Sequence, residues 1–194
     1  MDPSVNVTGI ILAGGQGRRM GGVDKGLQLL GGKPMIDHVI ARLAPQVVEI
    51  IINANQNLES YAKFGYPVAP DVTGGFAGPL AGLQAGLQAA GHPLVVTVPC
   101  DSPFLPLDLV ARLAAAIGDN DLAVAKTGAQ AHPVFALVHR KLLDHLTAYL
   151  AGGGRKIDAW YSTLKVVEVS FDDEMEAFSN INTREELQQH QSQQ

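Results

Sequence analysis

Strand and helix patterns alternate along this 194-residue chain, and the expected strands are continuous apolar runs. Residues 47–52 read Val-Val-Glu-Ile-Ile-Ile, and residues 94–98 read Leu-Val-Val-Thr-Val. Runs without regular polar alternation are typical of strands that helices cover on both faces. Strands of this kind, separated by helices, predict a three-layer, doubly wound α/β fold with a mostly parallel sheet.

The expected elements fill the chain without a linker or an internal repeat. Strands are predicted at residues 7–12, 47–53, 67–69, 94–98, 122–125, 133–138 and 165–171. Helices are predicted at residues 34–43, 58–64, 80–90, 106–117, 140–150 and 183–189. A chain of this length suits one domain, so we expect residues 1–194 to form a single unit.

Polar residues follow the expected strands where a ligand would bind. A glycine-rich loop follows the first strand, Asn53 ends the second, and Asp71 and Asp101 follow the third and fourth. In open parallel sheets, ligands bind at the carboxyl ends of the strands. We therefore expect these four features to surround one ligand, although Asn53 and Asp71 also suit ordinary turns.

The glycine-rich loop reads Leu-Ala-Gly-Gly-Gln-Gly-Arg-Arg-Met-Gly-Gly-Val-Asp-Lys-Gly-Leu over residues 12–27. Glycines let backbone N–H groups approach phosphate oxygens, and the basic side chains supply counter-charge. The loop lacks the Gly-Lys-Ser/Thr ending of a Walker A motif and the glycine spacing of the dinucleotide fingerprint. It therefore indicates a nucleotide-binding loop of another kind.

The spacing resembles the first loop of the nucleotidyltransferases, and Gly-Gly-x-Asp-Lys resembles the molybdenum cofactor guanylyltransferase family. Further segments similar to that family follow in order: Gly-Pro-Leu-Ala-Gly at 78–82, Cys-Asp-Ser-Pro at 100–103 and Asn-Ile-Asn-Thr at 180–183. The resemblance implies a Rossmann-like nucleotidyltransferase fold and transfer of GMP from GTP to molybdopterin with release of pyrophosphate. It implies GTP binding by the N-terminal half of the chain and pterin binding mainly by the C-terminal half.

The resemblance also assigns residues to roles. It implies catalytic roles for Arg19, Lys25 and Asp101, with Asp101 holding Mg²⁺, or Mn²⁺ as the alternative. A carboxylate just past a buried strand suits such an ion, because phosphate oxygens complete the coordination. The nucleotide-binding candidates are Leu12, Ala13, Gly14, Gly15, Gly22, Lys25, Asn53, Asp71, Gly78, Gly82 and Asp101, and the pterin candidates are Arg155, Lys156, Asn180 and Asn182.

Structural interpretations compete with some of these roles. Thr183 and Glu186 form a capping box, which accounts for the last motif without chemistry. Gly-Gly-Gly-Arg-Lys at 152–156 also suits a helix end with a solvated basic pair. A phosphate nucleophile needs no general base, so we assign none to His132, and no Ser-His-Asp or Cys-His arrangement is evident.

Other functions remain open at this point. The alternatives are a molybdopterin cytidylyltransferase, a sugar-phosphate nucleotidyltransferase, and a nucleotide-binding or cofactor-delivery module without turnover. Lys25 together with Asp101 favours an enzyme, because a binding module needs no metal ligand.

Composition narrows the partners. A net charge of -5 and a pI near 5.6 argue against a nucleic-acid or anionic-membrane surface. A single cysteine excludes an intrachain disulfide, and no leader or membrane-spanning stretch is evident, so we expect a cytoplasmic protein. Expected protein partners are an enzyme that supplies molybdopterin and chaperones of molybdoenzymes.

Overall fold

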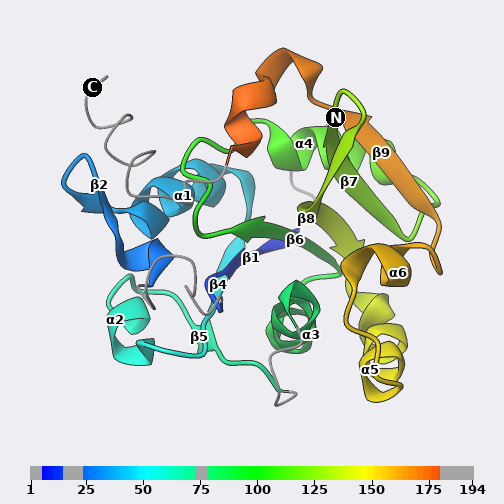
Figure 1. Cartoon of the computed structure of the whole chain (residues 1–194), viewed down its shortest axis with the longest axis horizontal. Helices are drawn as coiled ribbons and strands as arrows, with labels where there is room; N and C mark the ends of the chain where they lie inside the picture. Colours follow the sequence, from blue (N-terminus) through cyan, green and yellow to red (C-terminus); the bar gives the residue numbers. More distant parts are fainter. Residues whose placement is uncertain (1–5, 15–23, 73–77, 180–194) are drawn as a thin grey trace.

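The computed structural model describes residues 6–14, 24–72 and 78–179. At its centre lies a seven-stranded sheet in the order β5–β4–β1–β6–β8–β7–β9 (Figure 1). The strands are β1 (Val7–Leu12), β4 (Glu49–Asn53), β5 (Val68–Ala69), β6 (Leu94–Pro99), β7 (Leu122–Thr127), β8 (Gln130–His139) and β9 (Val166–Ser170). Neighbouring strands are parallel except where they pair with β8. The predicted mostly parallel sheet is therefore confirmed.

Helices cover both faces of this sheet (Figure 1). One face packs against α1 (Met35–Leu43) and α4 (Leu109–Ile117), and the other against α3 (Pro79–Ala89), α5 (Leu143–Ala151) and α6 (Ile157–Tyr161). Successive strand residues point to opposite faces, so Ile11 joins the first core and Ile10 the second. The three-layer prediction is confirmed, and the apolar runs are explained by burial on both sides.

Strand β8 runs antiparallel to its neighbours, which the sequence analysis did not predict. Its register pairs His139 with Leu94 at the start of β6 and Ala136 with Thr97. A tight turn at Gly128, where φ is +53°, joins β7 to β8 and makes the reversal. The strands predicted at 122–125 and 133–138 have no predicted helix between them, and seven residues are too few for a parallel crossover, so the sequence did carry a signal for this hairpin that the analysis missed.

The short elements were also missed. They are the hairpin of β2 (Leu29–Leu30) and β3 (Lys33–Pro34), the helix α6, and the 3₁₀ turns η2 (Lys25–Leu27), η3 (Ala44–Gln46) and η5 (Asp172–Phe178). The turn η4 (Arg140–Leu142) lies within the helix predicted at 140–150 and leads directly into α5. Helix α6 has five residues, too few for a visible helical period, and is held by buried Trp160 and Tyr161.

The remaining helix, α2 (Leu58–Ala62), ends two residues before the predicted boundary. The predicted helix at 183–189 lies outside the described residues. In the part of the chain that is described, none of the helices has the length and apolar character needed to cross a membrane.

Candidate active site

The chain leaves β1 between the ends of two parallel neighbours. Leu12 pairs with Asn53 of β4 on one side and with Pro99 of β6 on the other. Two further backbone bonds extend this pairing: the Ala13 amide donates to the Asn53 carbonyl at 2.8 Å, and the Cys100 amide donates to the Leu12 carbonyl at 3.1 Å. The start of the glycine-rich loop is thus fixed at the carboxyl edge of the sheet, as predicted.

Asn53 and Asp71 meet at this edge. The buried Asn53 side-chain amide donates to Asp71 Oδ1 at 2.9 Å and to the Ala69 carbonyl at 3.0 Å. Asn55, which the sequence analysis missed, donates to Asp71 Oδ2 at 2.9 Å and accepts from the Asp71 amide at 2.8 Å. Both carboxylate oxygens of Asp71 are therefore held by amides, which fixes its orientation beside the loop.

Two glycines make room for the Asn53 side chain. A Cβ on Gly14 would lie 3.1 Å from Asn53 Oδ1 and 2.9 Å from Asn55 Nδ2. A Cβ on Gly82 would lie 2.3 Å from Asn53 Oδ1 and 2.8 Å from Leu12 Cδ2. Gly82 is buried on α3, so its absent side chain lets the helix approach the strand ends closely. Contact between Gly82 and a base stays a prediction.

Helix α3 begins at this edge as well. Gly78 precedes it with φ +66° and ψ -154°, a backbone conformation that glycine adopts readily, and it is exposed. Farther along, a Cβ on Gly86 would lie 1.9 Å from Ile10 Cδ1, so α3 rests directly on β1. The two small residues at positions 82 and 86 hold the helix start close to the site.

Lys25 and Asp101 form an ion pair, with Lys25 Nζ 3.0 Å from Asp101 Oδ2. Lys25 begins the turn η2 and Asp101 comes just after β6, so 76 positions separate them in sequence. Their side chains are 21% and 13% exposed, so both charges stay accessible while being partly shielded from water. The sequence placed both residues at one edge but did not predict their direct contact.

Asp101 is the kind of ligand that holds a divalent metal ion together with oxygen atoms of a substrate. Among the described residues, no group of three or more His, Cys, Asp or Glu side chains is placed to hold a metal ion. A divalent cation of the Mg²⁺ type takes one or two carboxylates and fills its remaining positions with phosphate oxygens and water. One carboxylate beside Lys25, at the predicted phosphate-binding site, suits that arrangement.

Cys100 adjoins Asp101 but is no nucleophile. It is buried, and burial raises the pKa of its thiol far above neutrality. A thiol that stays protonated is a poor nucleophile. This agrees with the expectation that no Cys-His arrangement acts here.

Asp24, next to Lys25, has partners that the sequence analysis missed. Its carboxylate accepts a hydrogen bond from Tyr61 Oη at 2.5 Å and another from Asn57 Nδ2 at 3.0 Å. Tyr61 lies on α2 and is fully buried. A buried tyrosine needs a partner for its hydroxyl, but nothing in the sequence shows which residue supplies it.

The basic segment after α5 has a structural role. Arg155 Nη1 donates to the Leu150 carbonyl at 2.8 Å and to the Gly154 carbonyl at 2.6 Å, so it caps the end of α5. Lys156 is exposed, and its carbonyl accepts from Tyr149 Oη at 3.1 Å. A pterin contact by either side chain stays a prediction.

Several predicted site residues lie outside the described residues. They are Gly15, Arg19, Gly22, Asn180 and Asn182.

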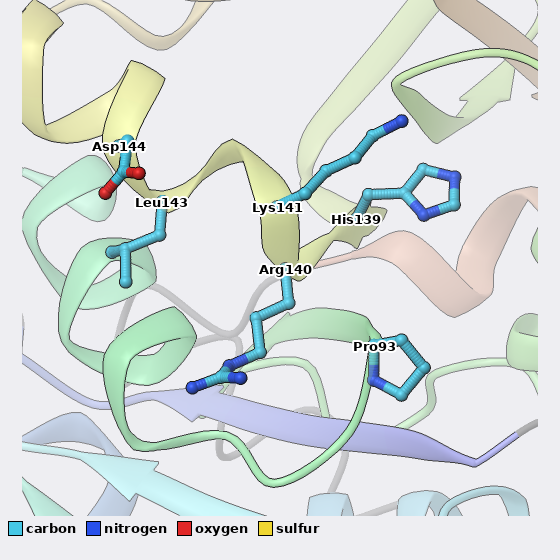
Figure 2. A pocket seen from close by; sticks show the side chains of 6 residues that line it. All are labelled: Pro93, His139, Arg140, Lys141, Leu143 and Asp144. Carbon is cyan, nitrogen blue, oxygen red and sulfur yellow. The ribbon is translucent and has the colours of Figure 1, made fainter.

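A hollow of about 480 Å³ lies elsewhere on the molecule, lined by Pro93, His139, Arg140, Lys141, Leu143 and Asp144 (Figure 2). His139 pairs with Leu94, the first residue of β6, whereas Asp101 follows the last residue of that strand. The hollow is therefore at the amino edge of the sheet, opposite the predicted ligand site. Its position argues against a role in binding the nucleotide.

Known proteins resemble this chain in sequence and in fold. The model of the MobA-like NTP transferase domain matches residues 9–166. The chain is 54% identical to the molybdenum cofactor guanylyltransferase of Cupriavidus necator, covering 96% of this chain and 97% of the relative. It is 52% identical to the enzyme of that name from Shewanella amazonensis, covering 96% of each chain.

A solved structure gives the same result. The molybdopterin-guanine dinucleotide biosynthesis protein A of Archaeoglobus fulgidus superimposes with a TM-score of 0.78 at 26% identity, covering 95% of this chain and 97% of the other.

Proposed function

The chain belongs to the MobA-like NTP transferase family, and we propose that it is a molybdenum cofactor guanylyltransferase, which transfers GMP from GTP to molybdopterin. The Lys25–Asp101 ion pair beside the glycine-rich loop carries this proposal, because it joins a phosphate-binding cation to a metal-binding carboxylate. Relatives more than half identical over nearly the whole chain carry the guanylyltransferase name, which favours guanine over cytosine as the base.

The reaction is a nucleotidyl transfer. An oxygen of the terminal phosphate of molybdopterin attacks the α-phosphorus of GTP and forms a new P–O bond. The bond from the α-phosphorus to the bridging oxygen of the β-phosphate breaks, and pyrophosphate leaves with that electron pair. The attacking phosphate is already ionised near neutral pH, so the chain needs no general base. Catalysis therefore depends on positioning and on neutralising charge.

The described residues can divide these tasks. Lys25 contacts the phosphates and offsets the charge that develops on the leaving pyrophosphate. The backbone from Leu12 to Gly14 is fixed beside Asn53, and it would lie along the nucleotide. Asp71 is held by two side-chain amides, and its carboxylate would accept a hydrogen bond from the nucleotide.

Asp101 would hold the divalent metal, for which we propose Mg²⁺, with Mn²⁺ as the alternative. When bound, the ion neutralises the oxygens of the triphosphate. The fit is supported by the partly exposed carboxylate of Asp101 just after β6, whose oxygens are of the type that a hard divalent cation prefers.

The two halves of the chain would serve the two substrates. The residues from Leu12 to Asp101 that surround the loop form the GTP side. The pterin side would involve Arg155 and Lys156, and also Asn180 and Asn182. Arg155 caps α5 with Nη1 alone among its guanidinium nitrogens, as far as the described residues show, and the other donors of its planar group would contact the substrate.

A turnover assay with a matched control tests the proposal. The protein is incubated with Mg²⁺, GTP and molybdopterin, and pyrophosphate release is measured for wild type, Asp101→Asn and Asp108→Asn. Asp108 is an exposed aspartate that precedes α4, and its substitution controls for the loss of one negative charge. We expect Asp101→Asn to lower the rate by about 100-fold or more and Asp108→Asn to match wild type. Wild-type turnover with an unaffected Asp101→Asn variant would contradict the assigned metal ligand.

A further inference from the structure

The carboxylate that precedes Lys25 is held from a distant part of the chain. Asp24 accepts hydrogen bonds from Tyr61 and Asn57, which lie 37 and 33 positions away in sequence. Tyr61 is on α2, and Asn57 is the residue directly before that helix. Tyr61 of α2 and the residue before that helix therefore hold Asp24 by hydrogen bonds, directly before the turn η2.

Tyr61 is held in place by its packing in the core. The tyrosine is fully buried in the same hydrophobic core as residues of α1 and α4, and its ring lies 6.3 Å from that of Phe64. Burial raises the pKa of Tyr61, so its hydroxyl stays protonated and remains a hydrogen-bond donor. A fixed donor that bonds to a carboxylate forms a strong, directional contact.

The turn that carries Lys25 is seated against the same tyrosine. A Cβ on Gly26 would lie 2.6 Å from Tyr61 Oη and 3.3 Å from Cys100 Sγ. Gly26 is buried, so only glycine lets the turn pack this closely between Tyr61 and the end of β6. The position of Lys25 is thereby set from both sides, by Asp24 before it and Gly26 after it.

Asn57 makes its hydrogen bond to Asp24 from an uncommon backbone conformation. It has φ 52° and ψ 34°, and it is the one non-glycine residue with positive φ among the described residues. Asparagine tolerates this left-handed conformation better than most residues. The conformation places its amide where it can donate to Asp24 Oδ2 at 3.0 Å.

These contacts also direct the charge of Lys25. Asp24 is the nearest acidic residue in sequence, yet both of its oxygens accept hydrogen bonds from α2. The Lys25 ammonium is directed instead to Asp101, 3.0 Å away, at the edge where the triphosphate binds. We infer that Tyr61, acting through Asp24, is a positioning residue that holds Lys25 beside Asp101 for nucleotidyl transfer. This inference rests on the proposed function.

The substitution Tyr61→Phe tests the inference, with Tyr161→Phe as the matched control. Phenylalanine keeps the buried ring and removes only the hydroxyl. Tyr161 is also buried, and its hydroxyl donates to the Pro133 carbonyl at 2.6 Å on the other face of the sheet. Both variants lose the hydrogen bond of a buried tyrosine hydroxyl, and Tyr61→Phe should lower the thermal unfolding midpoint more, because its acceptor is a carboxylate.

The two variants should differ in turnover. Because Lys25 acts on charge that develops in the transition state, Tyr61→Phe should lower kcat about tenfold and change the KM for GTP by less than about threefold. Tyr161→Phe should keep kcat within about twofold of wild type, because Tyr161 lies on the other face of the sheet and substitutions at distant sites act independently. Equal kcat values for the two variants would overturn the positioning role.

A test in the Lys25→Ala protein separates a loss of Lys25 positioning from a general loss of activity. If Tyr61 acts through Lys25, then Tyr61→Phe should cause no further loss of kcat in a Lys25→Ala protein. A tenfold loss that persists in that background would overturn the inference. Asn57→Gly offers an exposed second site, because glycine keeps the left-handed backbone but removes the amide. It should lower kcat in the wild-type background and not in Lys25→Ala.

The outcomes separate this inference from the function on which it rests. A wild-type protein that forms no guanine dinucleotide would refute the proposed function. Wild-type turnover together with equal Tyr61→Phe and Tyr161→Phe rates would refute only the positioning role.

Discussion

Replacing Gly82 by alanine tests whether the close approach of α3 to the strand ends supports nucleotide binding. The new Cβ would lie 2.3 Å from Asn53 Oδ1, so the asparagine side chain must move. Asn53 cannot move freely, because its amide donates to both Asp71 and Ala69. The substitution should therefore break the Asn53–Asp71 contact at the predicted GTP site.

The effect of Gly82→Ala on the free energy of unfolding follows from these contacts. Losing the bond to the Ala69 carbonyl costs about 1 kcal/mol, and losing the bond to the Asp71 carboxylate costs about 2 kcal/mol. Alanine gains about 1 kcal/mol over glycine inside a helix. The expected net loss in the free energy of unfolding is about 2 kcal/mol. Misplacing a binding group by a fraction of an ångström should also raise the KM for GTP about tenfold.

The assay combines urea denaturation with initial rates at varied GTP, and Gly152→Ala is the control. Gly152 caps α5 at φ -72°, and a Cβ there would meet nothing closer than 3.5 Å. That variant should lie within about 0.5 kcal/mol of wild type. If Gly82→Ala unfolded like Gly152→Ala and kept the wild-type KM, the Asn53 packing would have no role in binding.

Three other variants probe separate parts of the molecule. Lys25→Ala should lower kcat by about 100-fold, while urea denaturation should show a loss below about 1 kcal/mol, because its ion pair is partly exposed; a normal kcat would remove Lys25 from the mechanism. Arg155→Ala should cost about 1 kcal/mol of unfolding free energy through loss of the α5 cap, and an unchanged stability would refute that capping role. Burial lowers the pKa of His132, so its contribution to stability is complete above the unfolded value near 6.5 and is lost as pH falls through the lower native value. His132→Phe keeps an aromatic ring against Phe178. Between about pH 7.5 and pH 5.5, the free energy of unfolding should therefore fall less in this variant than in wild type. An equal fall in the two proteins would refute this reasoning.

The carboxyl edge of the sheet could be predicted from the sequence because the alternation of strands and helices predicts parallel strands, and the apolar pattern shows where each strand ends. Asn53, Asp71 and Asp101 each come at the end of an apolar run, and parallel strands bring such ends together. Their pairings could not be predicted, because they depend on loop geometry that no local pattern encodes. The Lys25–Asp101 contact and the Asn55–Asp71 contact belong to this class.

Side chains with two plausible roles were harder to interpret. Arg155 was assigned to the pterin side by resemblance, whereas the structure gives its guanidinium two carbonyl partners at the end of α5. Gly82 was assigned to the base pocket, and the structure buries it against Asn53 and Leu12. Packing and binding both favour glycine at such a place, so sequence alone does not separate them.

Mass spectrometry of the product tests the central claim most directly. The wild-type protein is incubated with molybdopterin, Mg²⁺ and an equimolar mixture of GTP, CTP, ATP and UTP, so that the four bases compete. A guanine dinucleotide of molybdopterin, formed with one pyrophosphate per product, is the predicted result. A cytosine dinucleotide, or no dinucleotide from a protein that still binds GTP, would contradict the assignment as a guanylyltransferase.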